Sequence, residues 1–527
     1  MELKKTVKRL VLGLLTVLVV LLVGTSLVQS FNQPQIQSRL ELYQTNLFLR
    51  GSQYEPEGPQ DPMAKAGAAL LGEEPYKGAI AQYEQAIAST KQTLQRTRDR
   101  LDSTVVVAPP QPQFPTPPLV EGSQATRQQQ QQLNAQIDKL QSLRDELRLQ
   151  LGILSAQQAE VTRARQIWTQ FTEVPNPNQQ PIAKTARVLL GLWQDNPRVL
   201  RDADELIQAN LDGWFRDRAL EKLYRVQNRD RALAQLSARE QQIAEEALLK
   251  LTLISGLPGL GVLLGVALLL FVLAQRVLKG KESLLAQNGD RDWDAPWDWE
   301  MIWQVFVVGF FFVAQILVPL LIAAIGIKSA TLAVRERAFY ILFTYILLAS
   351  GGLGVLFFSI KSFFPLGEEW FRIQWRDKWF LWGIGGYVAA LPLVILVSLI
   401  NQQIWQGRGG SNPILPIALS GQDNVALVIF FITASVAAPV FEEIMFRGFL
   451  LPSLTRYTSV WGAIAASSAL FALAHLNLSE VLPLATLGVV LGVVYTRSRN
   501  LLAPILLHSL WNSGTLLSLF ILGSGTN

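Results

Sequence analysis

The strongest constraint on the fold of this chain is a series of long apolar runs. A helix of about 20 apolar residues crosses a hydrocarbon core roughly 30 Å thick. Such runs occur at 10–28, 251–275, 302–327, 338–360, 379–401, 424–451, 460–479, 481–496 and 501–521. The sequence therefore predicts an all-α fold, a polytopic transmembrane helix bundle of about nine spans.

Residues 31–246, between the first two runs, are polar and rich in Gln, Ala, Arg and Leu. Apolar residues recur there with the heptad spacing that is typical of a coiled-coil seam. The seam residues are Ile80, Ile87, Leu94 and Leu101 in one arm, and Leu133, Ile137, Leu140, Leu147, Leu151, Leu154, Val161 and Trp168 in the other. The Pro-rich stretch 108–118 cannot be helical throughout, so we predict an antiparallel helical hairpin with a stiff tip.

Four regions follow from these patterns. Residues 1–30 are an N-terminal membrane anchor, which we expect to remain uncleaved although its basic flank also fits a signal peptide. Residues 31–246 are an exported, coiled-coil-like helical domain, 247–378 add transmembrane helices, and 379–527 are the domain that carries the chemistry. The basic N-terminus and most of the basic loops place the N-terminus in the cytoplasm, at a plasma or internal membrane.

Composition narrows the chemistry further. The 527-residue chain has no cysteine, which excludes disulfides, thiolate metal sites and a cysteine nucleophile. Its net charge of +5 indicates no nucleic-acid partner, because excess Lys and Arg in a membrane protein gather in short cytoplasmic loops. The H-E-x-x-H and G-x-S-x-G motifs are absent, which argues against zincin-type and serine hydrolases. The chain has two histidines, His475 and His508, and both lie in apolar C-terminal segments.

Glu442, Glu443 and Arg447 lie inside an otherwise apolar run. A charge near the bilayer centre costs at least about 2.5–3.5 kcal/mol, so we expect these groups to pair or to face a wet cavity. Glu443 and Arg447 are four residues apart and can form an ion pair on one helix face. Glu442 points about 100° away and is left for another role. A buried salt bridge that only fixes helix packing is the simpler alternative, and it explains Glu442 poorly.

Two further motifs lie in the following apolar segments. His475 ends an Ala-rich helix four residues after Phe471, where a lone histidine is more often a core residue than a ligand. His508 and Asn512 share one helix face, so both can point at one substrate group. The motifs are far more informative together, and we expect their polar side chains to converge in one layer in the inner half of the membrane.

The order EExxxR, FxxxH and HxxxN, each in a separate apolar helix, resembles the CAAX-protease and bacteriocin-processing family of type II CAAX prenyl endopeptidase-like intramembrane proteases. The residues that carry the resemblance are Glu442, Glu443, Arg447, Phe471, His475, His508 and Asn512. It covers about residues 379–521 and excludes 1–246. It implies an intramembrane endopeptidase that hydrolyses a peptide bond of a membrane-associated protein or peptide, with Glu443 orienting the site through Arg447.

The resemblance also implies how the remaining residues act. Glu442, together with His475, would polarise a water molecule as the general base. His508 and Asn512 would stabilise the oxyanion of the tetrahedral intermediate. In the other version of this mechanism, a divalent metal is held by Glu442, His475 and His508, and these ligand types suit zinc.

Two other functions stay open from the sequence. The main alternative is a non-proteolytic membrane scaffold that binds and stabilises partner membrane proteins, with residues 31–246 as the protein-binding surface. A transporter with a Glu/His proton relay would spread its ionisable residues along the chain, whereas here they gather in the C-terminal third. For a protease, the expected partners are a membrane protein or peptide substrate and membrane lipid.

Overall fold

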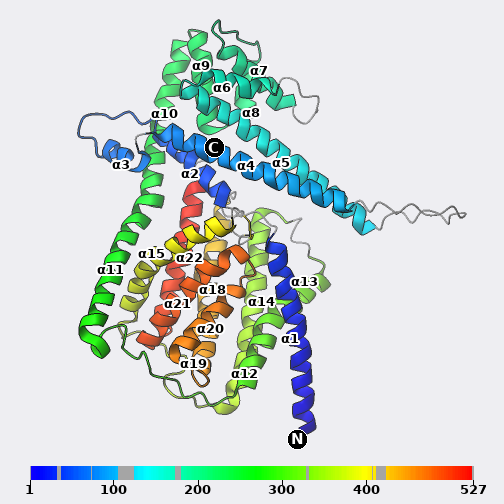
Figure 1. The fold of residues 1–527 in the computed structure, drawn as a ribbon, viewed down its shortest axis with the longest axis vertical. Helices are drawn as coiled ribbons and strands as arrows, with labels where there is room; N and C mark the ends of the chain where they lie inside the picture. Colours follow the sequence, from blue (N-terminus) through cyan, green and yellow to red (C-terminus); the bar gives the residue numbers. More distant parts are fainter. Residues whose placement is uncertain are drawn as a thin grey trace, which may run out of the picture. The chain divides into compact units, whose positions relative to one another are not determined.

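The structure, a computed structural model, describes residues 2–31, 37–72, 74–104, 124–171, 180–327, 332–405, 408–410 and 423–524. These residues are helical and contain no β-strand, which confirms the predicted all-α class. They form two units (Figure 1). Met1–Ile36 and Leu253–Ser524 make up the membrane unit, and Gln37–Thr252 make up the helical unit.

The helical unit is built from short and medium helices around a long pair. Its helices are α2 (Gln37–Gly51), α3 (Pro62–Leu71), α4 (Pro75–Thr104), α5 (Gln124–Gln157), α6 (Val161–Thr169), α7 (Gln180–Leu192), α8 (Ala203–Asn210), α9 (Gly213–Val226) and α10 (Asp230–Leu251). Helices α4 and α5 run side by side (Figure 1) and bury Ile80, Leu94, Leu147 and Leu151 of the heptad seam. The Pro-rich tip at 108–118 lies outside the described residues, and coiled-coil geometry stays a prediction.

The membrane unit contains the long apolar helices, several of which include π-helical segments, labelled η. Its elements are α1 (Glu2–Phe31), α11 (Leu257–Lys279), α12 (Trp299–Gln304), η4 (Val305–Leu317), α13 (Val318–Ile325), α14 (Val334–Ile360), α15 (Trp379–Trp405), α17 (Asn424–Ile432), η7 (Thr433–Ala437), α18 (Ala438–Glu443), η8 (Ile444–Leu450), α19 (Leu451–Leu454), α20 (Val460–Leu473), α21 (Val481–Ser498) and α22 (Leu502–Gly523). Another π segment, η2 (Thr252–Gly256), joins α10 to α11, and short 3₁₀ turns lie at Gly280–Glu282, Lys361–Phe363 and Leu478–Glu480.

Eight helices in the described part of the chain are long and apolar enough to cross a membrane, so the protein is an integral membrane protein. The span predicted at 460–479 is the exception. Helix α20 has 14 residues, or about 21 Å at 1.5 Å per residue, which is too short to cross alone. It ends because the chain turns after His475, where Leu476 adopts a left-handed φ of 61°. The predicted nine spans are therefore eight long helices and one short helix.

The loops that carry most of the basic residues meet at one end of the membrane unit. Arg456 donates hydrogen bonds to the carbonyls of Ala295 and Trp297 at 3.0 and 2.7 Å. Arg499, after α21, lies 3.2 Å from the carboxylate of Glu369. The charge pattern of the sequence groups the same loops on one side of the membrane, and its assignment of that side to the cytoplasm stays a prediction.

Helices α11 and α15 touch at two glycines of α11. A Cβ on Gly265 would lie 2.2 Å from the carbonyl oxygen of Val388 and 2.7 Å from Cδ of Pro392, and a Cβ on Gly261 would lie 2.6 Å from a methyl of Leu391. The close approach of the two backbones therefore requires residues without side chains, as at other small-xxx-small contacts.

We predict that Gly265→Ala lowers the melting temperature of the detergent-purified protein, because overpacking a tight contact costs about 1–3 kcal/mol and here the clash is with backbone. Gly259→Ala is the matched control on the same helix, since no atom lies within 4 Å of its added Cβ. Equal melting temperatures for the two variants would contradict a close α11–α15 contact.

Candidate active site

A buried cluster of charges is centred on one oxygen of Glu443. Oε1 of Glu443 accepts a hydrogen bond from Nη1 of Arg447 at 2.9 Å and another from Nδ1 of His508 at 2.8 Å. The side chains of Glu443 and Arg447 are 0% exposed. Arg447 also donates from Nη2 to the carbonyl of Gly488 at 3.1 Å. The cluster contains the predicted ion pair and joins α18, η8, α21 and α22.

Glu442 lies in a different environment from its neighbour. Its Oε2 is buried 4.0 Å from Nε2 of His508 and accepts no hydrogen bond from the described residues. Its Oε1 accepts a long hydrogen bond, 3.4 Å, from the hydroxyl of Tyr345 on α14. The side chain is 16% exposed, whereas that of Glu443 is fully enclosed. Glu442 therefore keeps acceptor capacity beside an imidazole, while Glu443 is committed to two donors.

Both histidines are held through the same ring nitrogen. Nδ1 of His475 lies 2.9 Å from the carbonyl of Phe471, and Nδ1 of His508 lies 2.8 Å from the Glu443 carboxylate. Because a carbonyl and a carboxylate only accept, these contacts assign the proton of each neutral ring to Nδ1. Nε2 of each neutral imidazole is then an acceptor, and it becomes a donor only when the ring carries a second proton.

The Phe471 ring lies in contact with both imidazoles. Its centroid is 4.9 Å from that of His475 and 5.7 Å from that of His508. The guanidinium carbon of Arg447 lies 4.6 Å from the same centroid, within the range of a cation–π contact. Phe471 is completely buried. The phenylalanine of the FxxxH motif thus positions both histidines and the arginine from one side.

Asn512 contacts the backbone of the helix that precedes the Glu pair. Its Nδ2 donates to the carbonyl of Ala434 at 2.7 Å. In the π turn η7, the N–H of Ala438 bonds to Thr433 rather than to Ala434. The next residue is Pro439, which has no N–H to offer. The carbonyl of Ala434 is therefore left without a helical donor, and one N–H of the Asn512 amide satisfies it.

The helix that carries the Glu pair is anchored outside the membrane by Asp423, the N-cap of α17. Its carboxylate accepts the side chain of Arg335 at 2.9 Å and the backbone N–H groups of Val425 and Ala426 at 3.0 and 3.1 Å. The hydrogen bond from Arg335 and the backbone hydrogen bonds lower the pKa of the Asp423 carboxyl below its usual range.

The structure brings together Glu442, Glu443, Arg447 and His508, places His475 against the same Phe471 ring, and binds Asn512 to the backbone one turn along α22 from His508. Sequence reasoning missed the Tyr345 hydroxyl and the backbone carbonyls of Ala434 and Gly488. A lone tyrosine in an apolar span carries no spacing signal. Pro439 within a helix does signal a freed carbonyl, and that clue could have pointed to Ala434.

The predicted zinc ligands are Glu442, His475 and His508. Among the described residues, no group of three or more His, Asp or Glu side chains is arranged to hold a metal ion. Nδ1 of His475 and Nδ1 of His508 are both occupied by hydrogen bonds, and the Phe471 ring contacts both imidazoles. These hydrogen bonds leave Nε2 of each histidine free to bind a metal, as in many metal sites. Glu442, His475 and His508 are nevertheless not grouped as a three-ligand site in this arrangement, and metal binding stays a prediction.

The fold and the site define a class of protein: a polytopic, all-helical membrane protein with a buried acid–base cluster. Residues 424–514 match the family model described as "Type II CAAX prenyl endopeptidase Rce1-like". These residues contain the EExxxR, FxxxH and HxxxN motifs in full. This match confirms the resemblance of the C-terminal membrane region to the CAAX-protease and bacteriocin-processing family.

Three curated proteins are similar to this chain. "Putative membrane peptidase YdiL" of Bacillus subtilis (strain 168) is 28% identical over 25% of this chain and 53% of its own length. "Membrane-embedded CAAX protease MroQ" of Staphylococcus aureus (strain USA300) is 23% identical over 40% of this chain and 87% of its own length. An "Uncharacterized 24.3 kDa protein" of Escherichia coli is 27% identical over 36% of this chain and 88% of its own length. The chain thus spans about half the length of the first relative and most of the other two. No solved structure matches the chain.

The capping role of Asn512 predicts a rescue. Asn512→Ala should destabilise the purified protein by about 1–3 kcal/mol, because it leaves the part-buried Ala434 carbonyl unpaired. Adding Pro439→Ala supplies a backbone N–H in that turn and should restore part of the lost thermal stability. A double variant that melts no higher than Asn512→Ala would contradict this role.

Proposed function

We propose that this protein is an intramembrane endopeptidase that hydrolyses a peptide bond of a membrane-associated protein or peptide. The observation that carries the proposal is Oε2 of Glu442, a buried acceptor without a donor among the described residues, 4.0 Å from Nε2 of His508. Membership of the Rce1-like family and the printed name of MroQ, a membrane-embedded CAAX protease, support the same activity.

In the proposed reaction, Glu442 is the general base. A water molecule that is hydrogen-bonded to Oε2 of Glu442 gives up a proton to it as its oxygen attacks the substrate carbonyl carbon. The carbonyl oxygen becomes an oxyanion. The protonated Glu442 then transfers the proton to the departing nitrogen as the C–N bond breaks. His475, whose Nε2 is an acceptor in the neutral ring, helps to orient the water.

The oxyanion needs donors, and the hydrogen bonds of the site limit which groups can serve. The second N–H of the Asn512 amide is available, since the contact with Ala434 uses the first. His508 can donate from Nε2 only as an imidazolium. A proton on His508 also balances the cluster, because Glu442 and Glu443 would otherwise face the single positive charge of Arg447 in a buried site. We therefore assign oxyanion stabilisation to Asn512 and protonated His508.

In the proposed reaction, Glu443 and Arg447 do not touch the reacting atoms and act through His508. Their ion pair is fully enclosed, and Glu443 fixes the ring of His508 through Nδ1. Removing one partner leaves the other as an uncompensated buried charge, which typically costs about 3–5 kcal/mol. We propose that they are positioning residues whose loss reduces activity and stability together.

Glu442→Gln should abolish proteolysis, a loss of at least about 10²–10⁴-fold for a general base, while leaving the protein inserted and thermally stable. His508→Ala should also abolish it. The measurement is comparative mass spectrometry of membrane peptides from Glu442→Gln and wild-type cells, in which uncut substrates persist in the variant.

The matched control for the carboxylate is Glu368→Gln, at an exposed position outside the apolar helices. It should process substrates as the wild type does. Normal processing by both Glu442→Gln and His508→Ala would refute the protease proposal. Loss of folding in Glu442→Gln would instead support a purely structural role for that carboxylate.

Removal of metal tests the alternative mechanism, in which Glu442, His475 and His508 hold a zinc ion. Because the three candidate ligands do not form a metal site in this arrangement, we predict that the purified protein keeps its activity after dialysis against a zinc chelator. Activity that disappears on dialysis and returns with zinc would contradict the water-and-carboxylate mechanism and support the metal version.

A further inference from the structure

The membrane unit contains a cavity, separate from the candidate active site, whose lining includes none of the candidate catalytic residues. It has a volume of about 860 Å³, near the upper end of the roughly 300–1,000 Å³ typical of ligand pockets. It lies between α11, the start of α15 and the C-terminal half of α21, beyond the point where Gly261 and Gly265 bring α11 and α15 together.

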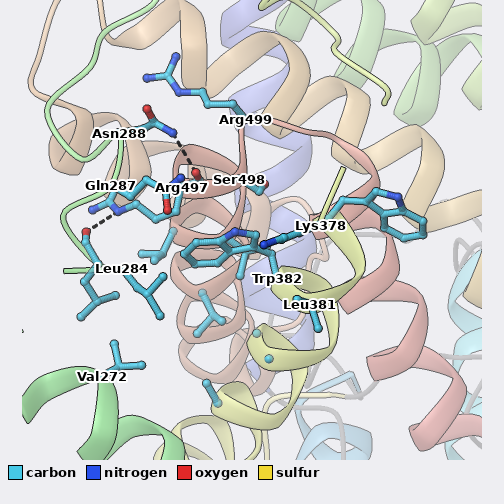
Figure 2. A pocket seen from close by; sticks show the side chains of 18 of the residues that line it. Val272, Leu284, Gln287, Asn288, Lys378, Leu381, Trp382, Arg497, Ser498 and Arg499 are labelled. Atoms are coloured by element: carbon cyan, nitrogen blue, oxygen red, sulfur yellow. Dashed lines mark hydrogen bonds between the residues drawn. The ribbon is translucent and has the colours of Figure 1, made fainter. Parts of the chain in front are cut away.

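The deeper part of the cavity is an apolar shaft. Its walls include Leu268 and Val272 of α11, Trp382 and Leu393 of α15, and Val490 and Val494 of α21. In Figure 2, Val272 and Leu284 lie on one side of this space and Trp382 on the other. A shaft with these walls suits a hydrocarbon chain, because apolar burial there requires no polar partner.

The mouth of the cavity is basic and lies among the loops that meet at the end of the unit. The basic side chains that line it are Arg291, Arg372, Lys378, Arg497 and Arg499, against the carboxylates of Glu369 and Asp377. Glu369 already pairs with Arg291 and Arg499, and Asp377 pairs with Arg372. Burial lowers the pKa of Arg499 to about 10, which leaves it protonated at neutral pH.

Arg497 and Lys378 have no carboxylate within 4 Å among the described residues. Arg497 is 1% exposed, and its donors bind the carbonyl of Leu285 and the hydroxyl of Thr496, which are neutral groups. Figure 2 shows Lys378 and Arg497 facing the same space at the mouth. The exposed Asp290 carboxylate interacts with Arg497 by charge at longer range but forms no ion pair with it. A buried cation without a contacting anion is costly, so the mouth favours an anion.

We propose that this cavity binds an anionic phospholipid of the surrounding leaflet, with an acyl chain in the shaft and the phosphate at the basic mouth. The apolar walls and the excess of cations occur in the order that a lipid presents them from the bilayer interior to its surface. Basic pockets between transmembrane helices are a recurrent way of holding such headgroups. The site is separate from the proposed peptidase activity and does not depend on it.

The shaft can be tested by filling it. Gly385 lines the cavity, and no atom lies within 4 Å of a Cβ built on it, so Gly385→Leu should occupy the shaft without a clash. Gly354→Leu on α14 is the matched control, because its Cβ also meets nothing within 4 Å and it does not line the cavity. Native mass spectrometry of the full-length, detergent-purified protein would measure retention of added phosphatidylglycerol. We expect retention by the wild type and Gly354→Leu, and loss in Gly385→Leu.

The basic mouth of the cavity can be tested by reversing the charge of one of its residues. Lys378→Glu should weaken phosphatidylglycerol retention at least about fivefold, since a basic residue near an anionic lipid contributes roughly that factor. Arg376→Glu makes the same charge change on the same loop at a position that does not line the cavity, and it should have little effect. Phosphatidylcholine with the same acyl chains should be retained less than phosphatidylglycerol.

Three results would overturn the proposal. The first is equal retention of the two lipids by the wild type, which would indicate an apolar cavity that accepts any amphiphile. The second is undiminished phosphatidylglycerol retention in both Gly385→Leu and Lys378→Glu. The third is an equal loss in the two control variants. Because the readout is lipid mass and not cleavage, the outcome is independent of whether Glu442 is a catalytic base.

Discussion

The candidate active site depends on a single buried oxygen, Oε1 of Glu443. It accepts from Arg447 and His508, and Arg447 reaches onward to the carbonyl of Gly488. Four helical segments are thereby tied to one carboxylate in an environment where an unpaired charge would be expensive. Glu442, one residue earlier, is consequently presented beside the fixed imidazole with an oxygen to spare. In the proposed mechanism the two adjacent carboxylates therefore have different roles: Glu443 holds the cluster together, and Glu442 is the general base.

Departures from regular helix build the rest of the site. The π turn at Thr433–Ala437 and the proline that follows it free the Ala434 carbonyl, and that carbonyl fixes Asn512. A second π segment, Ile444–Leu450, carries Arg447, whose guanidinium pairs with Glu443 in the preceding segment. π turns inside helices are rare and are often found at functional sites. Helix α21 contributes to both the candidate active site and the proposed lipid cavity, because the Gly488 carbonyl accepts from Arg447 while Val490 and Val494 line that cavity.

The sequence predicted the helical class, the long apolar helices and the Glu443–Arg447 pair, because each of these follows from local periodicity or four-residue spacing. It did not predict that α20 stops after 14 residues, since a turn at Leu476 is set by one backbone dihedral and not by hydropathy. The positions of His475 and His508 around Phe471 depend on the packing of α20, with the turn that follows it, against α22. Such contacts cannot be predicted from a single sequence, and neither can the basic mouth of the proposed lipid cavity.

The most direct test of the central claim is the fate of the water oxygen. The purified full chain would be mixed in H₂¹⁸O with a substrate that accumulates in Glu442→Gln membranes, and the product of a single turnover would be examined by mass spectrometry. The account predicts that the new C-terminal carboxylate carries ¹⁸O from the solvent in the wild type and that Glu442→Gln yields no product. Cleavage by Glu442→Gln at the wild-type rate, or a new terminus without solvent oxygen, would contradict it.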